Sequence, residues 1–125
     1  DKMNPKLRKN STFLGYVEDQ SRFFKDIDLF IFPSYSEGLG LVLLEAMSYQ
    51  KICITRNVEP MNRFINNKNG YLFNDIKELE DSITQASNDL KKENIYLEKI
   101  RNIKKVLEIY DIENVFPKIL EVYKL

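Results

Sequence analysis

Short apolar segments alternate with helical segments between residues 12 and 75, and this alternation constrains the fold more than any other feature of the sequence. Short apolar runs that end at Pro or at turn residues are typical of strands, and helices between consecutive strands make them parallel. We expect strands at 12–17, 28–33, 52–55 and 71–73, and helices at 18–26, at 41–47 and just after Pro60. The run 28–33 is apolar enough to predict burial on both faces. The pattern predicts the α/β class, with a Rossmann-like parallel sheet and helices on both of its faces.

The remaining stretch, 76–125, carries only helical periodicity. Asp75 and Glu78 have the spacing of a helix-capping pair. Three apolar stripes follow at helical spacing: Ile76, Leu79, Ile83, Ala86 and Leu90; then Tyr96, Ile100, Ile103, Leu107 and Tyr110; then Val115, Phe116, Ile119, Leu120 and Tyr123. We therefore expect a single domain over 1–125, made of an α/β part at 12–75 and a helical C-terminal tail at 76–125.

The composition excludes several chemistries. Among 125 residues there is no His and only one Cys, so a histidine base, a histidine metal site, an internal disulfide and a zinc cluster are all excluded. The 19 Lys and Arg residues balance 19 Asp and Glu residues, which removes the electrostatic argument for a nucleic-acid partner. No signal-peptide core or membrane-spanning run is present in the sequence, so we expect a cytoplasmic protein that is at most peripheral at the membrane. Cys53 lies in an apolar run and is expected to be an inert core thiol.

The turn from Pro33 to Gly40 joins a predicted strand to a predicted helix, and such junctions bind ligands in doubly wound sheets. Gly38 and Gly40 let the backbone turn sharply, and the next helix points its positive end at the same place. This chemistry suits a phosphate or diphosphate. A tight loop that needs glycine only for its dihedral angles explains the spacing equally well. Leu43 stands where a dinucleotide fingerprint would have its third glycine.

Two glutamates flank this turn. Glu45 lies inside an apolar helical segment, where an unpaired carboxylate would be costly to bury, so we expect it to have a partner. It lies less than about 10 Å from the predicted helix start, which would let it reach a ribose hydroxyl. The alternative is a carboxylate that faces solvent or pairs with Lys or Arg. Glu37 precedes the helix and is better placed for the reacting end of a ligand, or it complements the helix dipole.

Three segments, 13–17, 28–34 and 37–47, resemble glycosyltransferase family 4. Glu37 and Glu45 match the E-x7-E signature of that family, within P-S-x-x-E-G-x-G and E-A-M contexts that make the match specific. The resemblance implies a retaining enzyme of the GT-B fold that uses a nucleotide-sugar donor, linked to UDP or GDP, and no bound metal. It also implies a bacterial cell-envelope polysaccharide or glycolipid as the product.

The resemblance further implies roles for individual residues. Glu37 would be the catalytic residue, in contact with donor-sugar hydroxyls beside the anomeric carbon. The positions implied to bind the nucleotide-sugar are Gly38, Leu39, Gly40, Leu41 and Glu45. Glu45 would hold the nucleotide ribose, and backbone amides of the glycine turn would face the sugar and diphosphate. The start of the helix would then stabilise charge on the departing diphosphate.

Some features depart from the family pattern. The stretch 48–52 has no glycine, so the helix before it is expected to end without a glycine cap, and 57–60 replaces a loop that usually contains glycine. Asp26 and Asp28 match the D-x-D metal motif of another glycosyltransferase fold, but they precede a strand rather than follow it. We interpret them as a helix end and a strand entry.

Complete enzymes of this family have two Rossmann-like domains. We expect the chain to be an incomplete donor domain, lacking an N-terminal acceptor domain, the first two strands and a basic pair. With 12–17 as third strand and 28–33 as fourth, the sheet would have unpaired edges, unless a longer protein or a second copy covers them. The residues alone would then be inactive. Two alternatives stay open: a non-catalytic nucleotide-binding or assembly module, and a related GT-B phosphorylase or epimerase.

Overall fold

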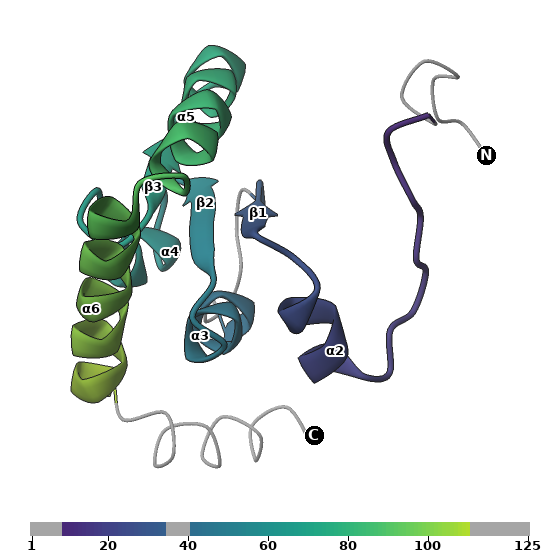
Figure 1. The fold of residues 1–125 in the computed structure, drawn as a ribbon, viewed down its shortest axis with the longest axis horizontal. Coiled ribbons are helices and arrows are strands. Elements are labelled where there is room, and N and C mark those ends of the chain that lie inside the picture. The colour runs from purple at the N-terminus through teal and green to yellow at the C-terminus, as the bar shows by residue number, and fades with distance from the viewer. Residues whose placement is uncertain (1–8, 35–40, 111–125) are drawn as a thin grey trace.

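The computed structural model describes residues 9–34 and 41–110. Figure 1 shows the elements in these ranges: α2 (Gln20–Lys25), β1 (Leu29–Phe32), α3 (Leu41–Ser48), β2 (Ile52–Arg56), α4 (Met61–Phe64), β3 (Tyr71–Phe73), α5 (Ile76–Asp89) and α6 (Glu93–Tyr110). The predicted helix at 115–123 lies outside the described residues. No helix in the described ranges is both long and apolar enough to cross a membrane.

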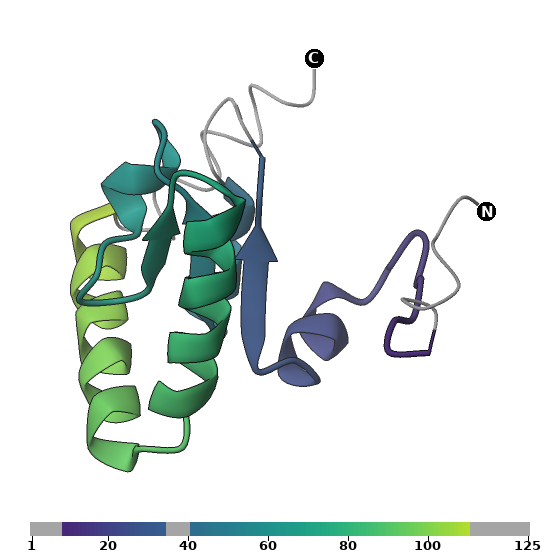
Figure 2. The same ribbon diagram turned by 90° about the horizontal axis from the view of Figure 1, so that it is seen from above.

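The three strands form a parallel sheet in the order β1-β2-β3. Leu29 pairs with Ile52, and Ile54 pairs with Tyr71, so each strand lies beside the next one along the chain. Helices α3 and α4 pack on β2, α5 packs on β2 and β3, and α6 packs on α3. In Figures 1 and 2, α3 and α5 lie on opposite sides of β2. The predicted α/β class with a parallel sheet is confirmed.

The central strand β2 is the part of the sheet that is covered on both faces. Its first four residues, Ile52, Cys53, Ile54 and Thr55, are all buried. Cys53 is a buried thiol, so its predicted core position is confirmed, and burial raises its pKa to about 12, which agrees with an inert thiol. The strand β1, in contrast, is paired on one side only, and Ile31 is 39% exposed. The prediction that 28–33 is buried on both faces is wrong: Leu29, Phe30 and Phe32 are only half-buried and Ile31 is exposed, so the described residues leave part of the surface of β1 uncovered.

The predicted strand at 12–17 is also wrong. These residues form an extended arm before α2, without strand hydrogen bonds, and Phe13 and Tyr16 are 87% and 90% exposed. Figure 2 shows this arm leading away from the sheet. A β-strand needs a hydrogen-bonded neighbour, and no strand among the described residues lies beside the arm.

The helix α3 ends without glycine, as predicted. The Gln50 N–H donates to Met47 O at 2.8 Å and the Lys51 N–H donates to Ala46 O at 3.1 Å, which is the hydrogen-bond pattern of a Schellman motif. Gln50 takes the left-handed conformation, with φ +60°, that glycine usually occupies.

The two long helices carry the rest of the core. The Asp75 side chain accepts a hydrogen bond from the Glu78 N–H at 2.8 Å, which confirms the predicted cap of α5. Ile76 was expected in the core stripe of α5 but is 75% exposed, because the stripe begins at Leu79 and includes the buried Ser82. In α6 the predicted core residues Ile100 and Ile103 are buried.

Candidate functional site

The carboxyl ends of the three parallel strands meet at one edge of the sheet, and this edge is where ligands bind in doubly wound folds. Pro33 follows β1, Arg56 ends β2, and Asn74 follows β3. Four of the predicted site residues, Glu37, Gly38, Leu39 and Gly40, lie outside the described residues. Leu41 and Glu45 lie within them, on α3.

The helix α3 presents Leu41 and Glu45 one helical turn apart. Leu41 is its first residue, and Glu45 follows about 6 Å along the helix axis, at about 1.5 Å per residue. The helix is anchored through its buried residues Leu43, Leu44, Ala46 and Met47. The position of Glu45 relative to the helix start is therefore fixed by core packing.

Glu45 is half-buried in a cavity of about 530 Å³. The arm before α2, the aromatic residues Phe23, Phe24 and Phe30, and Val42 of α3 line this cavity. The side-chain amide of Gln20, assigned with its nitrogen toward the carboxylate, donates a hydrogen bond to Glu45. The expected partner of Glu45 is thus a neutral amide on α2. No Lys or Arg of 9–34 or 41–110 forms an ion pair with it.

Burial in this largely apolar cavity raises the pKa of Glu45 above its ordinary value of 4.5, because desolvation disfavours the charged form. As pH rises, the unfolded chain therefore loses this proton before the folded chain does. The folded state is destabilised progressively above pH 4.5, and the full penalty is reached above the raised pKa.

A stability measurement can test this penalty. Glu45→Gln removes the ionisable group and keeps the side-chain shape, so we expect the midpoint of thermal unfolding at pH 7 to rise by up to about 3 °C. The difference should shrink as pH falls to about 4 and below, where the carboxyl group becomes largely neutral in both states. Glu108→Gln, at an exposed position of α6, is the matched control and should have no such pH-dependent effect. A stabilisation that persisted unchanged at pH 4 would contradict the desolvation explanation.

Side chains at the end of β2 donate hydrogen bonds to the backbone at the end of β1. The Thr55 hydroxyl donates to Phe32 O at 3.0 Å, and Arg56 Nε donates to Pro33 O at 3.2 Å. Arg56 also donates through Nη1 to Asn74 O at 3.4 Å, and its guanidinium lies 5.0 Å from the centre of the Phe73 ring. One arginine therefore connects the ends of all three strands. The sequence analysis missed this residue, although a cation that ends a buried strand is the signal that could have identified it.

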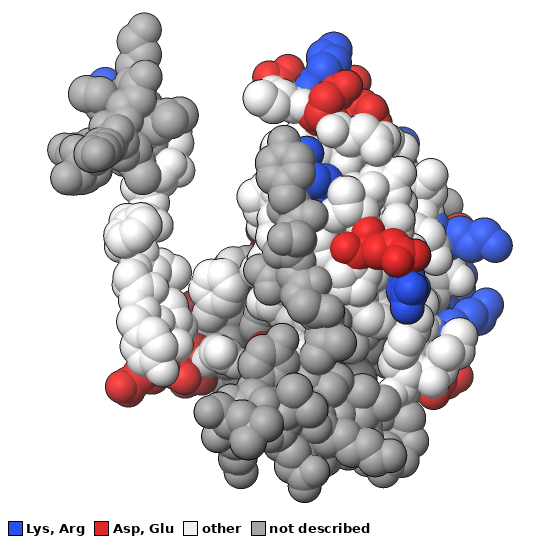
Figure 3. All heavy atoms as spheres, turned by 180° about the vertical axis from the view of Figure 1, so that it is seen from behind, with Lys and Arg blue, Asp and Glu red and all other residues white. Residues whose placement is uncertain are grey.

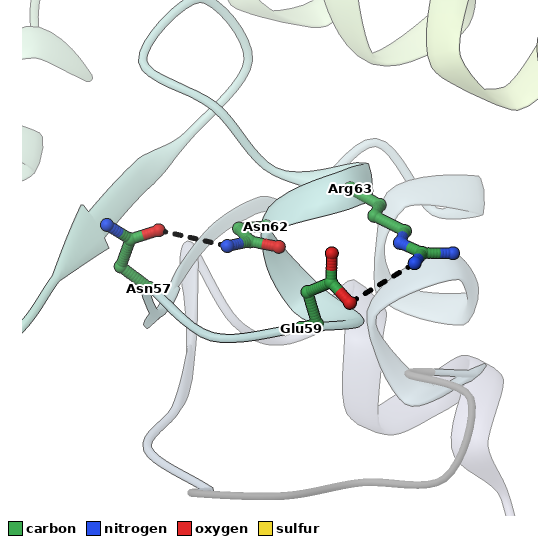
Figure 4. Close-up of polar contacts among 4 residues, drawn as sticks. All are labelled: Asn57, Glu59, Asn62 and Arg63. Carbon is green, nitrogen blue, oxygen red and sulfur yellow. Dashed lines mark hydrogen bonds and ion pairs between the residues drawn. The ribbon is translucent and has the colours of Figure 1, made fainter.

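The loop after β2 adds a second polar group at this edge. Figure 4 shows two side-chain pairs between this loop and α4: Asn62 Nδ2 donates to Asn57 Oδ1 at 3.2 Å, and Arg63 forms an ion pair with Glu59 at 3.1 Å. Both members of the ion pair are exposed, so the pair contributes little to stability, on the order of 0–1 kcal/mol. This polar loop replaces the glycine-containing loop expected from the resemblance.

Asp26 and Asp28 lie away from this edge. Asp26 caps the end of α2 and Asp28 precedes β1, as predicted for a helix end and a strand entry. They line a cavity of about 780 Å³ near the amino ends of β1 and β2, together with Lys51 and Lys91. The described residues contain no group of three or more acidic or Cys side chains that could hold a metal ion.

Charges of both signs are mixed on the surface. Figure 3 shows acidic and basic side chains beside one another on the described part of one face, with an uncharged arm at one side. This distribution agrees with the formal net charge of zero. The expectation that nucleic acid is not a partner remains a prediction.

Comparison with known proteins identifies the family. A family model described as "Glycosyl transferases group 1" matches residues 3–105, which is most of the chain. The chain belongs to this family. The sequence resemblance is therefore confirmed at the level of the family.

Relatives of this group 1 glycosyltransferase chain include two bacterial enzymes. The chain is 32% identical over 120 residues to the UDP-Gal:alpha-D-GlcNAc-diphosphoundecaprenol alpha-1,3-galactosyltransferase of Escherichia coli. This match covers 94% of the chain and 30% of that protein. The chain is 27% identical over 121 residues to the poly(ribitol-phosphate) alpha-N-acetylglucosaminyltransferase of Staphylococcus aureus (strain COL), matching 94% of the chain and 24% of that protein. The chain thus spans less than a third of the length of either relative.

The crystal structure of TarM has a similar fold. The TM-score is 0.64 and the identity 21%, over 88% of the chain and 22% of TarM. At this identity the likeness concerns the fold alone. It supports the assignment of the described residues to the GT-B type of α/β fold.

Proposed function

We propose that this group 1 glycosyltransferase chain is the donor-binding part of a retaining enzyme, which transfers a sugar from a UDP- or GDP-linked donor to a saccharide or lipid-linked acceptor. Family membership supports the reaction class. The names of the two relatives, one of which uses a diphosphoundecaprenol acceptor and the other poly(ribitol-phosphate), support a role in cell-envelope polysaccharide or glycolipid synthesis. An acceptor domain outside these residues and a cytoplasmic location at the inner face of the membrane belong to the same proposal.

The observation that carries the proposal is the environment of Glu45. A carboxylate that is half-buried beside a cavity, raised in pKa and paired only with a neutral amide among the described residues destabilises the folded state. Strained or costly polar groups of this kind cluster at functional sites. Glu45 follows the start of α3 by one turn, at the ligand-binding edge of the sheet. Binding of a ribose hydroxyl would give this carboxylate a second donor beside the Gln20 amide.

The other roles follow from the start of α3. The first N–H groups of α3, which have no acceptor within the helix, and the positive end of the helix dipole lie at Leu41, where an anionic diphosphate would be stabilised. We assign the amides of Gly38, Leu39 and Gly40 to the sugar and diphosphate, and Glu37 to the donor-sugar hydroxyls beside the anomeric carbon. As the sugar departs, this helix start would stabilise the charge that develops on the diphosphate. The proposal includes no metal ion.

Calorimetric titration with UDP, GDP and ADP, and with their sugar conjugates, tests the proposal. The longest natural chain that contains these residues should bind one nucleoside diphosphate more tightly than the other two, and should transfer its sugar with retention. Absence of heat with all three nucleotides would favour a non-catalytic assembly module. The exposed arm residues Phe13 and Tyr16, together with the open edge of β1, are the observations that favour this second candidate.

A further inference from the structure

Arg56 occupies a position that the proposed reaction does not yet use. Its side chain reaches from the end of β2 to the backbone carbonyls of Pro33 and Asn74, at 3.2 and 3.4 Å. These carbonyls belong to the first residues after β1 and β3. The strands β1 and β3 are not neighbours in the sheet, so no sheet hydrogen bond joins them. Arg56 therefore connects the exits of these two strands, which are the points where the chain leaves them.

The chemistry of arginine suits this connection. The guanidinium is planar and always charged, and it offers donors in fixed directions, so two carbonyls held by one side chain are fixed relative to each other. Its plane also lies over the Phe73 ring, which restricts the side chain further. A lysine at this position would keep the charge but could not reproduce two donors in a rigid fork.

The contact with Pro33 fixes the direction in which the chain leaves β1. The neighbouring Thr55 holds Phe32 O at 3.0 Å, so the last residue of β1 and the residue that follows it are both held from β2. Glu37 follows Pro33 by four residues in the sequence. A misplacement of about 1 Å at a reacting centre can cost about a hundredfold in rate, so a fixed exit from β1 would matter for the transfer step.

We propose that Arg56 is a positioning residue, which holds the exits of β1 and β3 together at the donor-binding edge of the sheet and thereby acts on the sugar-transfer step. This inference rests on the proposed function. It differs from a role in binding the diphosphate by charge, because a positioning residue acts on the sugar and on the chemical step rather than on nucleotide affinity.

Kinetics and binding of Arg56→Ala test the inference, in the longest natural chain that contains these residues. The expected result is a fall in kcat of at least about tenfold, with the dissociation constant of the free nucleoside diphosphate unchanged within about threefold. Arg56→Lys should show the same pattern, because lysine keeps the positive charge but cannot donate to both carbonyls in fixed directions. If Arg56→Ala fails to fold, the lysine variant provides the same comparison. Arg101→Ala is the matched control, because Arg101 is an exposed arginine of α6 and is not part of the candidate site.

The outcomes separate the two proposals. If the wild-type protein transfers sugar but Arg56→Ala behaves like Arg101→Ala, the positioning role is overturned and the proposed function stands. Equal losses of nucleoside diphosphate and nucleotide-sugar affinity, or full rescue by lysine, would also overturn it, in favour of a charge that binds the diphosphate. If the wild-type protein binds no nucleotide-sugar, both proposals fail.

Discussion

Glu45→Ala is expected to weaken binding of the nucleoside diphosphate and of the nucleotide-sugar alike, by about 10-fold to 100-fold. A hydrogen bond from a ribose hydroxyl to a carboxylate contributes about 1.5–3 kcal/mol, and both ligands contain the ribose. Isothermal titration with the preferred nucleotide, alone and linked to its sugar, measures both affinities. The carboxylate is half-buried and its helix is anchored in the core, so the loss should arise without a general loss of fold.

Glu37→Ala provides the contrast. Its proposed contact is with the sugar, so affinity for the free nucleoside diphosphate should stay within about threefold while transfer falls by about 100-fold or more. Glu108→Ala, which removes an exposed carboxylate of α6, is the matched control and should change neither quantity. If Glu37→Ala and Glu45→Ala weakened both ligands equally, the division of roles between the two glutamates would be wrong.

Gly70→Ala is expected to destabilise the folded chain by about 3 kcal/mol or more. A Cβ atom at this position would lie 2.6 Å from the backbone oxygen of Cys53 and 2.9 Å from Cγ2 of Ile65. Both neighbours are fully buried, and Cys53 belongs to the central strand β2, so neither can move without disturbing the core. Urea denaturation followed by circular dichroism would measure the change.

Gly15→Ala is the control for this substitution. Gly15 has φ +66°, which disfavours alanine, but no atom lies within 4 Å of the added Cβ. The expected change is therefore no more than about 1 kcal/mol. Of these two glycines only Gly15 has a positive φ, so a similarly small change at both positions would show that Cys53 and Ile65 can make room for a Cβ atom at position 70.

The elements that were predicted correctly have local causes. The strand β2 was recognised from its apolar run, α3 from its Leu, Ala and Met content, and α5 from the cap at Asp75. Each cause lies within a few residues of its element, so the sequence contains the whole signal. The glycine-free end of α3 was predicted for the same reason, and Gln50 takes the position of the glycine.

The features that were missed depend on contacts distant in sequence. Whether 12–17 forms a strand depends on a neighbouring strand, and whether β1 is buried on both faces depends on which distant elements pack on those faces. Likewise, Arg56 connects residues 23 and 18 positions away. The partner of Glu45, Gln20, comes from a helix that precedes β1. Periodicity and motifs contain no information on such pairs.

The environment of Glu45 also has an evolutionary consequence. At this position, resistance to heat and affinity for the donor are expected to favour different residues, because the desolvated carboxylate that would bind ribose also destabilises the fold. A library of variants selected for thermal stability alone should therefore lose Glu45 early, whereas a library selected for donor binding should retain it. Sequencing the two surviving populations would then identify the ligand-binding carboxylate without any measurement of an individual protein.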